Sequence, residues 1–87
     1  MTRRKLDMRG IEGLNARSAA MLVQAACKFT SRILIEQGSK VVNAKSLMGV
    51  LSLSAKSLDT LYLVLDGEDE TEAARTIDDL IQTRFIA

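Results

Sequence analysis

Apolar residues recur in two periods along this chain, and each period predicts one kind of element. Residues 2–8 alternate, with Arg4, Leu6 and Met8 on one side, which is the pattern of a weak edge strand. Residues 16–28 instead carry apolar side chains at helical spacing, and these are Ala19, Leu22, Val23, Ala26 and Cys27. Because this spacing puts them on one stripe, it predicts an amphipathic helix that packs on a flat apolar surface.

The middle of the chain predicts a hairpin, a short helix and a strand. Residues 30–43 hold two β-forming runs on either side of a Gln-Gly-Ser turn, which is the pattern of a β-hairpin. The apolar run at 47–53 predicts a two-turn helix with Ser46 as its N-cap. The run at 58–66 is apolar enough to be a central strand.

A last helix is predicted to begin at Asp69, because Glu72 follows three residues later in the spacing of a capping box. The side chains on its inner face are Ala73, Ala74, Ile77, Leu80, Ile81 and Arg84. The predicted order is therefore β-α-β-β-α-β-α. Strands with one apolar face need cover, and three helices can supply it from one side. We expect an α+β fold, a four-stranded, mainly antiparallel sheet with three helices on one face, in a single domain over residues 1–87.

Composition removes most kinds of catalysis. The 87 residues include no histidine, so the commonest general base and most zinc sites are excluded, and we expect no metal and no cofactor. The five glycines have no phosphate-loop spacing, and no basic stripe surrounds Tyr62, so we expect no direct binding of nucleic acid. Asp78 and Asp79 point about 100° apart on a helix and cannot share a substrate. The chain is therefore not expected to be an enzyme.

Charge and hydropathy indicate the compartment but not the partner. The net charge is only +1, although the first ten residues are basic and residues 66–72 are acidic. These segments either polarise the molecule or are simply solvated, and the sequence favours the second reading. No apolar run approaches the ~18 residues of a membrane span, so we expect a cytoplasmic protein without a membrane contact. The single cysteine, Cys27, fits a reducing compartment, and its place on the helix stripe predicts a buried side chain rather than a nucleophile.

Two predicted helix starts remain as candidate sites. Asn15 precedes the first helix and Ser46 precedes the short one, and the first backbone N–H groups of a helix have no partner inside it. Such an end can bind an anion, but Asn and Ser are also favoured as plain N-caps. The residues alone leave both interpretations open and favour the plain cap.

Three motifs stand out along the chain: residues 13–19 read GLNARSA, residues 43–53 read NAKSLMGVLSL, and residues 67–70 read GEDE. They resemble motifs of the HPr family, the phosphocarriers of the bacterial sugar phosphotransferase system. The family has Gly-Leu-His-Ala-Arg-Pro-Ala at the first motif, a Lys-Ser-Ile-Met-Gly-Val regulatory site at the second, and the start of its last helix at the third. The similarity runs from about residue 2 to residue 86. It implies the family's open-faced β-sandwich, which agrees with the predicted order.

The resemblance also implies which chemistry is lost. Asn15 stands at the position of the phosphorylated histidine, and an amide nitrogen, whose lone pair is delocalised, is neither a base nor a nucleophile. Ser18 replaces the family's proline. Arg17 corresponds to a residue beside the family's active-site phosphate, so it is either a partner contact or a solvated side chain. This pattern resembles the histidine-lacking, catabolite-repression subgroup known as Crh.

For the second motif, the resemblance implies regulation. The serine that matches Ser46 is phosphorylated in Gram-positive relatives by HPr kinase/phosphorylase, and the product is a corepressor of a LacI-type regulator. Leu47, Met48 and Leu51 would then lie beside Ser46 as an apolar anchor for a partner. The alternative is a phosphocarrier that has lost its histidine and keeps only docking to Enzyme I and sugar-specific proteins. A homodimer formed by exchange of the basic first strand also stays open.

Overall fold

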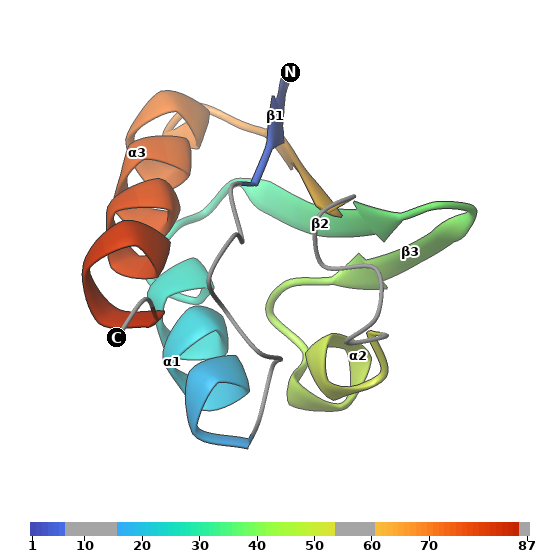
Figure 1. Ribbon diagram of the computed structural model, residues 1–87. Helices are drawn as coiled ribbons and strands as arrows, with labels where there is room; N and C mark the ends of the chain where they lie inside the picture. Colours follow the sequence, from blue (N-terminus) through green and yellow to red (C-terminus); the bar gives the residue numbers. More distant parts are fainter. Residues whose placement is uncertain (7–15, 54–60, 86–87) are drawn as a thin grey trace.

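Four strands form one antiparallel sheet in the order β1-β4-β2-β3 (Figure 1). The structure, a computed structural model, describes residues 1–6, 16–53 and 61–85. The strands are β1 (Thr2–Lys5), β2 (Arg32–Gln37), β3 (Lys40–Asn43) and β4 (Leu61–Asp66). The predicted sheet is confirmed, including the edge position of the first strand and the central position of the last. The predicted strand parts at residues 7–8 and 58–60 lie outside the described residues.

Three helices complete the fold. They are α1 (Ala16–Ala26), α2 (Leu47–Leu51) and α3 (Glu70–Leu80), and α3 continues into the π-helical turn η2 (Ile81–Phe85). Figure 1 shows them gathered on one side of the sheet, and α1 packs against both other helices. The order β-α-β-β-α-β-α and the α+β class are therefore confirmed.

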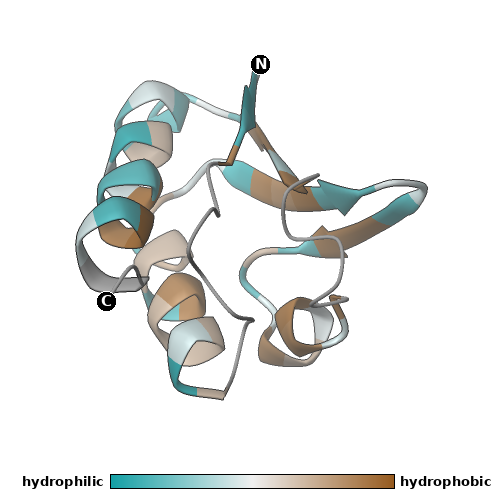
Figure 2. Ribbon diagram, viewed as in Figure 1, coloured by the Kyte–Doolittle hydropathy of each residue, from teal (hydrophilic) through white to brown (hydrophobic). Residues whose placement is uncertain are grey.

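The core lies between the sheet and these helices. Side chains on a strand point alternately to its two faces, and in β2 and β4 every second residue is buried. The buried strand residues are Ile33, Ile35, Leu61, Leu63 and Leu65, and the helices add Ala19, Leu22, Ala26, Val50, Ala73, Ala74 and Ile77. Figure 2 shows apolar, brown stretches along the strands of the sheet and on the helices. The other sheet face carries half-buried and exposed residues, which is why the sandwich is open on that side.

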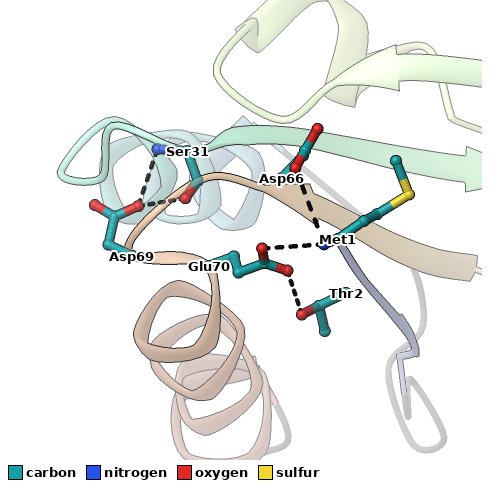
Figure 3. A network of polar contacts seen from close by, with 6 residues as sticks. All are labelled: Met1, Thr2, Ser31, Asp66, Asp69 and Glu70. Carbon is teal, nitrogen blue, oxygen red and sulfur yellow. Dashed lines mark hydrogen bonds and ion pairs between the residues drawn. The ribbon is translucent and has the colours of Figure 1, made fainter.

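The capping box predicted at the start of the last helix is wrong. Asp69 occupies the N-cap position of α3, but its carboxylate makes no hydrogen bond to the first turn. It accepts instead from the backbone N–H groups of Thr30 and Ser31, each at 2.9 Å, and from both hydroxyls. Figure 3 shows the two bonds from Ser31. The Ser31 hydroxyl, followed by the Thr30 N–H, lowers the pKa of Asp69 from 3.8 to about 2. Four donors from a distant segment outcompete the local N–H groups.

A neighbouring carboxylate ties the chain start to the same helix. Glu70 accepts a hydrogen bond from the Thr2 hydroxyl and lies 3.2 Å from the terminal ammonium group of Met1 (Figure 3). The Thr2 bond, followed by the ammonium group, lowers the pKa of Glu70. Together with Asp69, this residue connects α3 to both β1 and the start of β2.

The basic side chains at the start of the chain contact other residues of the same molecule. Arg3 forms an ion pair with Glu36 at 3.1 Å, and its guanidinium carbon lies 3.9 Å from the centre of the Tyr62 ring. Arg4 lies 3.7 Å from the carboxylate of Asp78 on α3. These contacts fix β1 to β4, β2 and α3. The basic segment is thus partly neutralised by acidic residues elsewhere in the chain.

Burial of Cys27, predicted from the helix stripe, is also wrong. The first helix ends at Ala26, two residues before the predicted end, and Cys27 lies in the following turn with an exposed thiol. Its Sγ lies 4.0 Å from the carbonyl oxygen of Lys45. Because the helix ends before Cys27, helical spacing no longer predicts which way its side chain faces.

Candidate functional site

Ser46 is the N-cap of α2, as predicted. Its backbone is extended, with φ −108° and ψ 116°, and its Oγ accepts a hydrogen bond from the Gly49 N–H at 3.2 Å. This bond satisfies one of the N–H groups that the first turn of a helix leaves without a partner. The hydroxyl proton takes no part in this bond, so the oxygen stays available as a nucleophile once a base removes that proton.

The turn before α2 holds Ser46 in place. The side chain of Asn43 accepts a hydrogen bond from the Lys45 N–H at 2.9 Å, and the carbonyl of Asn43 accepts one from the Ser46 N–H at 3.0 Å. This is the local pattern by which an Asn side chain stabilises a tight turn. The position of Ser46 is therefore fixed relative to the end of β3.

Three apolar side chains of α2 are exposed beside Ser46, and we name them the α2 patch. Leu47 is 42% exposed, Met48 79% and Leu51 40%. Val50, on the opposite side of this single helical turn, is fully buried and anchors α2 in the core. Clustered apolar side chains at a surface are typical of protein contacts. Leu47 and Met48 are thus exposed, as the resemblance implied, and they directly follow Ser46, which is half-buried.

The other predicted site residues lie on α1 or just before it. Arg17 is exposed in the first turn of α1. Asn15, at the position of the family's histidine, lies outside the described residues, so its predicted capping role stays a prediction. The turn after α1 contacts the residue that precedes Ser46, because the Cys27 Sγ lies 4.0 Å from the carbonyl oxygen of Lys45.

The described residues offer little for other chemistry. Within residues 1–6, 16–53 and 61–85 there is no group of three His, Cys, Asp or Glu side chains that could hold a metal ion. No helix in these segments has the length and hydropathy that crossing a membrane requires.

Comparison with known proteins identifies the family. A family model described as the PTS HPr component phosphorylation site matches residues 2–83. The chain belongs to the HPr family. Ser46 and the α2 patch lie within the matched residues, and so does the position of Asn15.

Within the HPr family, both branches are similar to this chain. The HPr-like protein Crh of Halalkalibacterium halodurans is 44% identical over 77 residues, which cover 88% of this chain and 92% of that protein. The phosphocarrier protein HPr of Treponema pallidum is also 44% identical, over 73 residues that cover 84% and 83%. Overall identity therefore does not decide between the two branches.

A solved structure of the HPr family matches the fold. Crh of Bacillus subtilis, described as a dimer with a swapped domain, is 41% identical with a TM-score of 0.73, and the match covers 94% of each chain. This agreement confirms the open-faced β-sandwich that the resemblance implied.

Sequence reasoning about this HPr-family chain missed one residue at the site. The Lys45 side chain is half-buried, and its Nζ donates a hydrogen bond to the carbonyl oxygen of Phe29 at 2.8 Å. The sequence shows only a lysine before a helix cap, and nothing local indicates that its ammonium group reaches a turn 16 residues earlier.

Proposed function

We propose that this chain is a regulatory HPr-family protein of the Crh type, switched by phosphorylation of Ser46 and acting through the α2 patch in carbon catabolite repression. The observation that carries the proposal is the placement of a serine hydroxyl, held by the Asn43 turn, next to three exposed apolar side chains. The similarity to Crh proteins supports it.

The proposed modification is simple phosphoryl transfer. The Ser46 Oγ attacks the γ-phosphorus of ATP in the active site of HPr kinase/phosphorylase, which supplies the base that takes the hydroxyl proton. An O–P bond forms to Ser46 as the bond from the γ-phosphorus to ADP breaks. The product carries about −1.5 to −2 charges and three acceptor oxygens at the start of α2.

The added charge changes a surface and does not need to change the fold. Before modification the α2 patch offers a partner mainly apolar contact. Afterwards it is bordered by a dianionic group, which matches a partner that combines an apolar pocket with arginine side chains. The partner that we propose is a LacI-type transcriptional regulator, for which the phosphorylated chain would be the corepressor.

Phosphate transfer from position 15 is not part of the proposal. Asn15 has no free lone pair on nitrogen, and the whole chain contains no histidine that could replace the family's nucleophile. The proposed role is therefore that of a binding protein without catalytic activity.

The test is phosphorylation by purified HPr kinase/phosphorylase with ATP, followed by intact-mass analysis. Wild type should gain one phosphate and Ser46→Ala should gain none. Ser52→Ala is the matched control, because its hydroxyl lies at the other end of α2 and donates to the Gly49 carbonyl, and it should be phosphorylated like wild type. A wild-type chain that gains no phosphate contradicts the proposal.

A second candidate is a phosphocarrier that has lost its nucleophile and still docks to Enzyme I. It is favoured by the 44% identity to a phosphocarrier and by the exposed Arg17 in the first turn of α1. Under this alternative, Asn15→His should take up phosphate from Enzyme I and phosphoenolpyruvate, and wild type should compete for Enzyme I. If wild type does not compete for Enzyme I but is phosphorylated at Ser46, this alternative fails and the regulatory role is supported.

We also propose a homodimer formed by exchange of β1. The swapped dimer described for the Bacillus subtilis relative supports this arrangement. The contacts of β1 with Glu36, Asp78 and Glu70 could be remade unchanged with a partner copy, since an exchange keeps each interface. Light scattering across protein concentrations should show a dimer, and a monomer at every concentration would contradict it.

A further inference from the structure

Lys45 directly precedes Ser46, and its ammonium group makes a hydrogen bond within the protein. Its Nζ donates to the carbonyl oxygen of Phe29 at 2.8 Å, and the side chain is half-buried. Phe29 follows the end of α1, and its N–H bonds back to the carbonyl of Ala26 at 3.2 Å. The ammonium group therefore binds in the turn that closes α1.

This bond is favourable at that position. The Phe29 carbonyl lies three residues beyond Ala26, the last residue of α1, and it accepts a charge-assisted hydrogen bond, which is stronger than a neutral one. The last turn of α1 contains no basic residue of its own, so the cation at the turn after α1 comes from a different segment. The Sγ of Cys27, in the same turn, lies 4.0 Å from the backbone carbonyl oxygen of Lys45, so the two turns contact each other at two points.

We propose that Lys45 is a positioning residue for Ser46: it fastens the turn at residues 43–46 to the end of α1 and so fixes the place of the Ser46 hydroxyl. The proposal rests on the proposed function for its consequence in the kinase reaction. On the β3 side the turn is held by Asn43, and on the α2 side Ser46 accepts from Gly49. Ala44, between them, is buried and its N–H donates to the Ile33 carbonyl at 2.9 Å. Lys45 adds the side-chain attachment that ties the turn to the segment after α1.

The substitution that tests this is Lys45→Met, which keeps an apolar stem and removes the donor. Lys40→Met is the matched control, because the Nζ of Lys40 makes the same kind of bond, at 2.7 Å, to the carbonyl of Ser52 beyond the other end of α2. Lys45→Arg is the rescue variant, since its guanidinium group can also reach the Phe29 carbonyl. Melting curves set a temperature at which every variant is folded.

The first measurement does not involve the kinase. Amide hydrogen exchange by NMR reads the Gly49 N–H, which reports directly on the bond to the Ser46 Oγ. In Lys45→Met this proton should exchange about tenfold faster than in wild type, because the turn opens locally more often. In Lys40→Met and Lys45→Arg it should exchange within about twofold of wild type. Unchanged exchange in Lys45→Met overturns the proposal.

The second measurement is the kinetics of phosphorylation by HPr kinase/phosphorylase. Lys45→Met should lower kcat about tenfold with little change in KM, because a displaced hydroxyl loses its reactive geometry while the α2 patch still docks. Lys45→Arg should recover most of the rate, and Lys40→Met should keep it. Faster Gly49 exchange with a wild-type kcat overturns the positioning role. If wild type itself takes no phosphate, the proposed function fails, and Gly49 exchange alone still decides whether Lys45 holds Ser46.

Discussion

Gly67 is the position where one added methyl group should have the largest effect on stability. Its φ is +157°, and a Cβ built on its backbone would lie 2.6 Å from the Cα of Ser31 and 2.8 Å from its Cβ. Real Cβ atoms do not approach other carbon atoms so closely, and the Ser31 backbone cannot simply rotate away. This close approach packs the turn before α3 against Ser31, whose backbone N–H donates a hydrogen bond to Asp69. Gly67→Ala must therefore push these two segments apart.

The magnitude follows from two costs. Strain at a backbone angle that side chains rarely adopt is about 1–3 kcal/mol, and overpacking a tight site is about 1–3 kcal/mol. A combined loss of about 2–6 kcal/mol should lower the Tm of a chain this small by at least about 8 °C. Gly38→Ala is the matched control, because Gly38 also has a positive φ, +61°, but nothing lies within 4 Å of its Cβ position; it should cost only about 1 kcal/mol. Urea and thermal unfolding of both variants give the comparison, and equal losses would refute the argument from close approach.

Three further outcomes are expected from the same structure. The folded-state pKa of Asp69 lies below its ordinary 3.8, so its contribution to stability is complete above about pH 5 and is lost as the pH falls towards 2. The Tm of wild type should therefore drop more than that of Asp69→Asn between these pH values, and parallel curves would contradict it. Met48→Ala should change the free energy of unfolding by less than about 0.5 kcal/mol but should weaken partner binding. Val50→Ala should lower the free energy of unfolding by about 2 kcal/mol, and urea unfolding measures both changes. Arg3→Met should cost about 1 kcal/mol at low salt and less at 1 M salt, because an exposed ion pair and a ring contact are lost.

Sequence reasoning succeeded where a residue's role depends on its neighbours in the chain. Ser46 caps α2 because the donor, the Gly49 N–H, is three residues away, and the hairpin turn needs only Gly38 between two β-forming runs. The fold class followed from the order of such local elements. The exposure of Met48, by contrast, was expected only from the resemblance to the HPr family, and in the structure the residue is 79% exposed.

Sequence reasoning failed where a residue's contacts come from distant segments of the chain. Asp69 has the sequence of a capping residue, but Ser31 and Thr30 offer it four donors from 38 or 39 positions earlier. Cys27 fits the apolar stripe, but α1 ends one residue before it, in a turn that Lys45 binds. No local pattern reports these contacts, because they depend on which segments the sheet and helices bring together.

The loss of one kind of phosphate chemistry does not require the loss of the other. A phosphocarrier must supply its own nucleophile with a free lone pair, and an amide at position 15 removes it at once. A phosphorylated serine needs only an accessible hydroxyl in a fixed turn, because the kinase brings the base, the nucleotide and the transition-state charges. The contacts that hold Ser46 come from the end of β3, from α2 and from the turn after α1. An amide at position 15 can therefore abolish transfer while these contacts, which involve other residues, still fix the Ser46 hydroxyl beside the α2 patch.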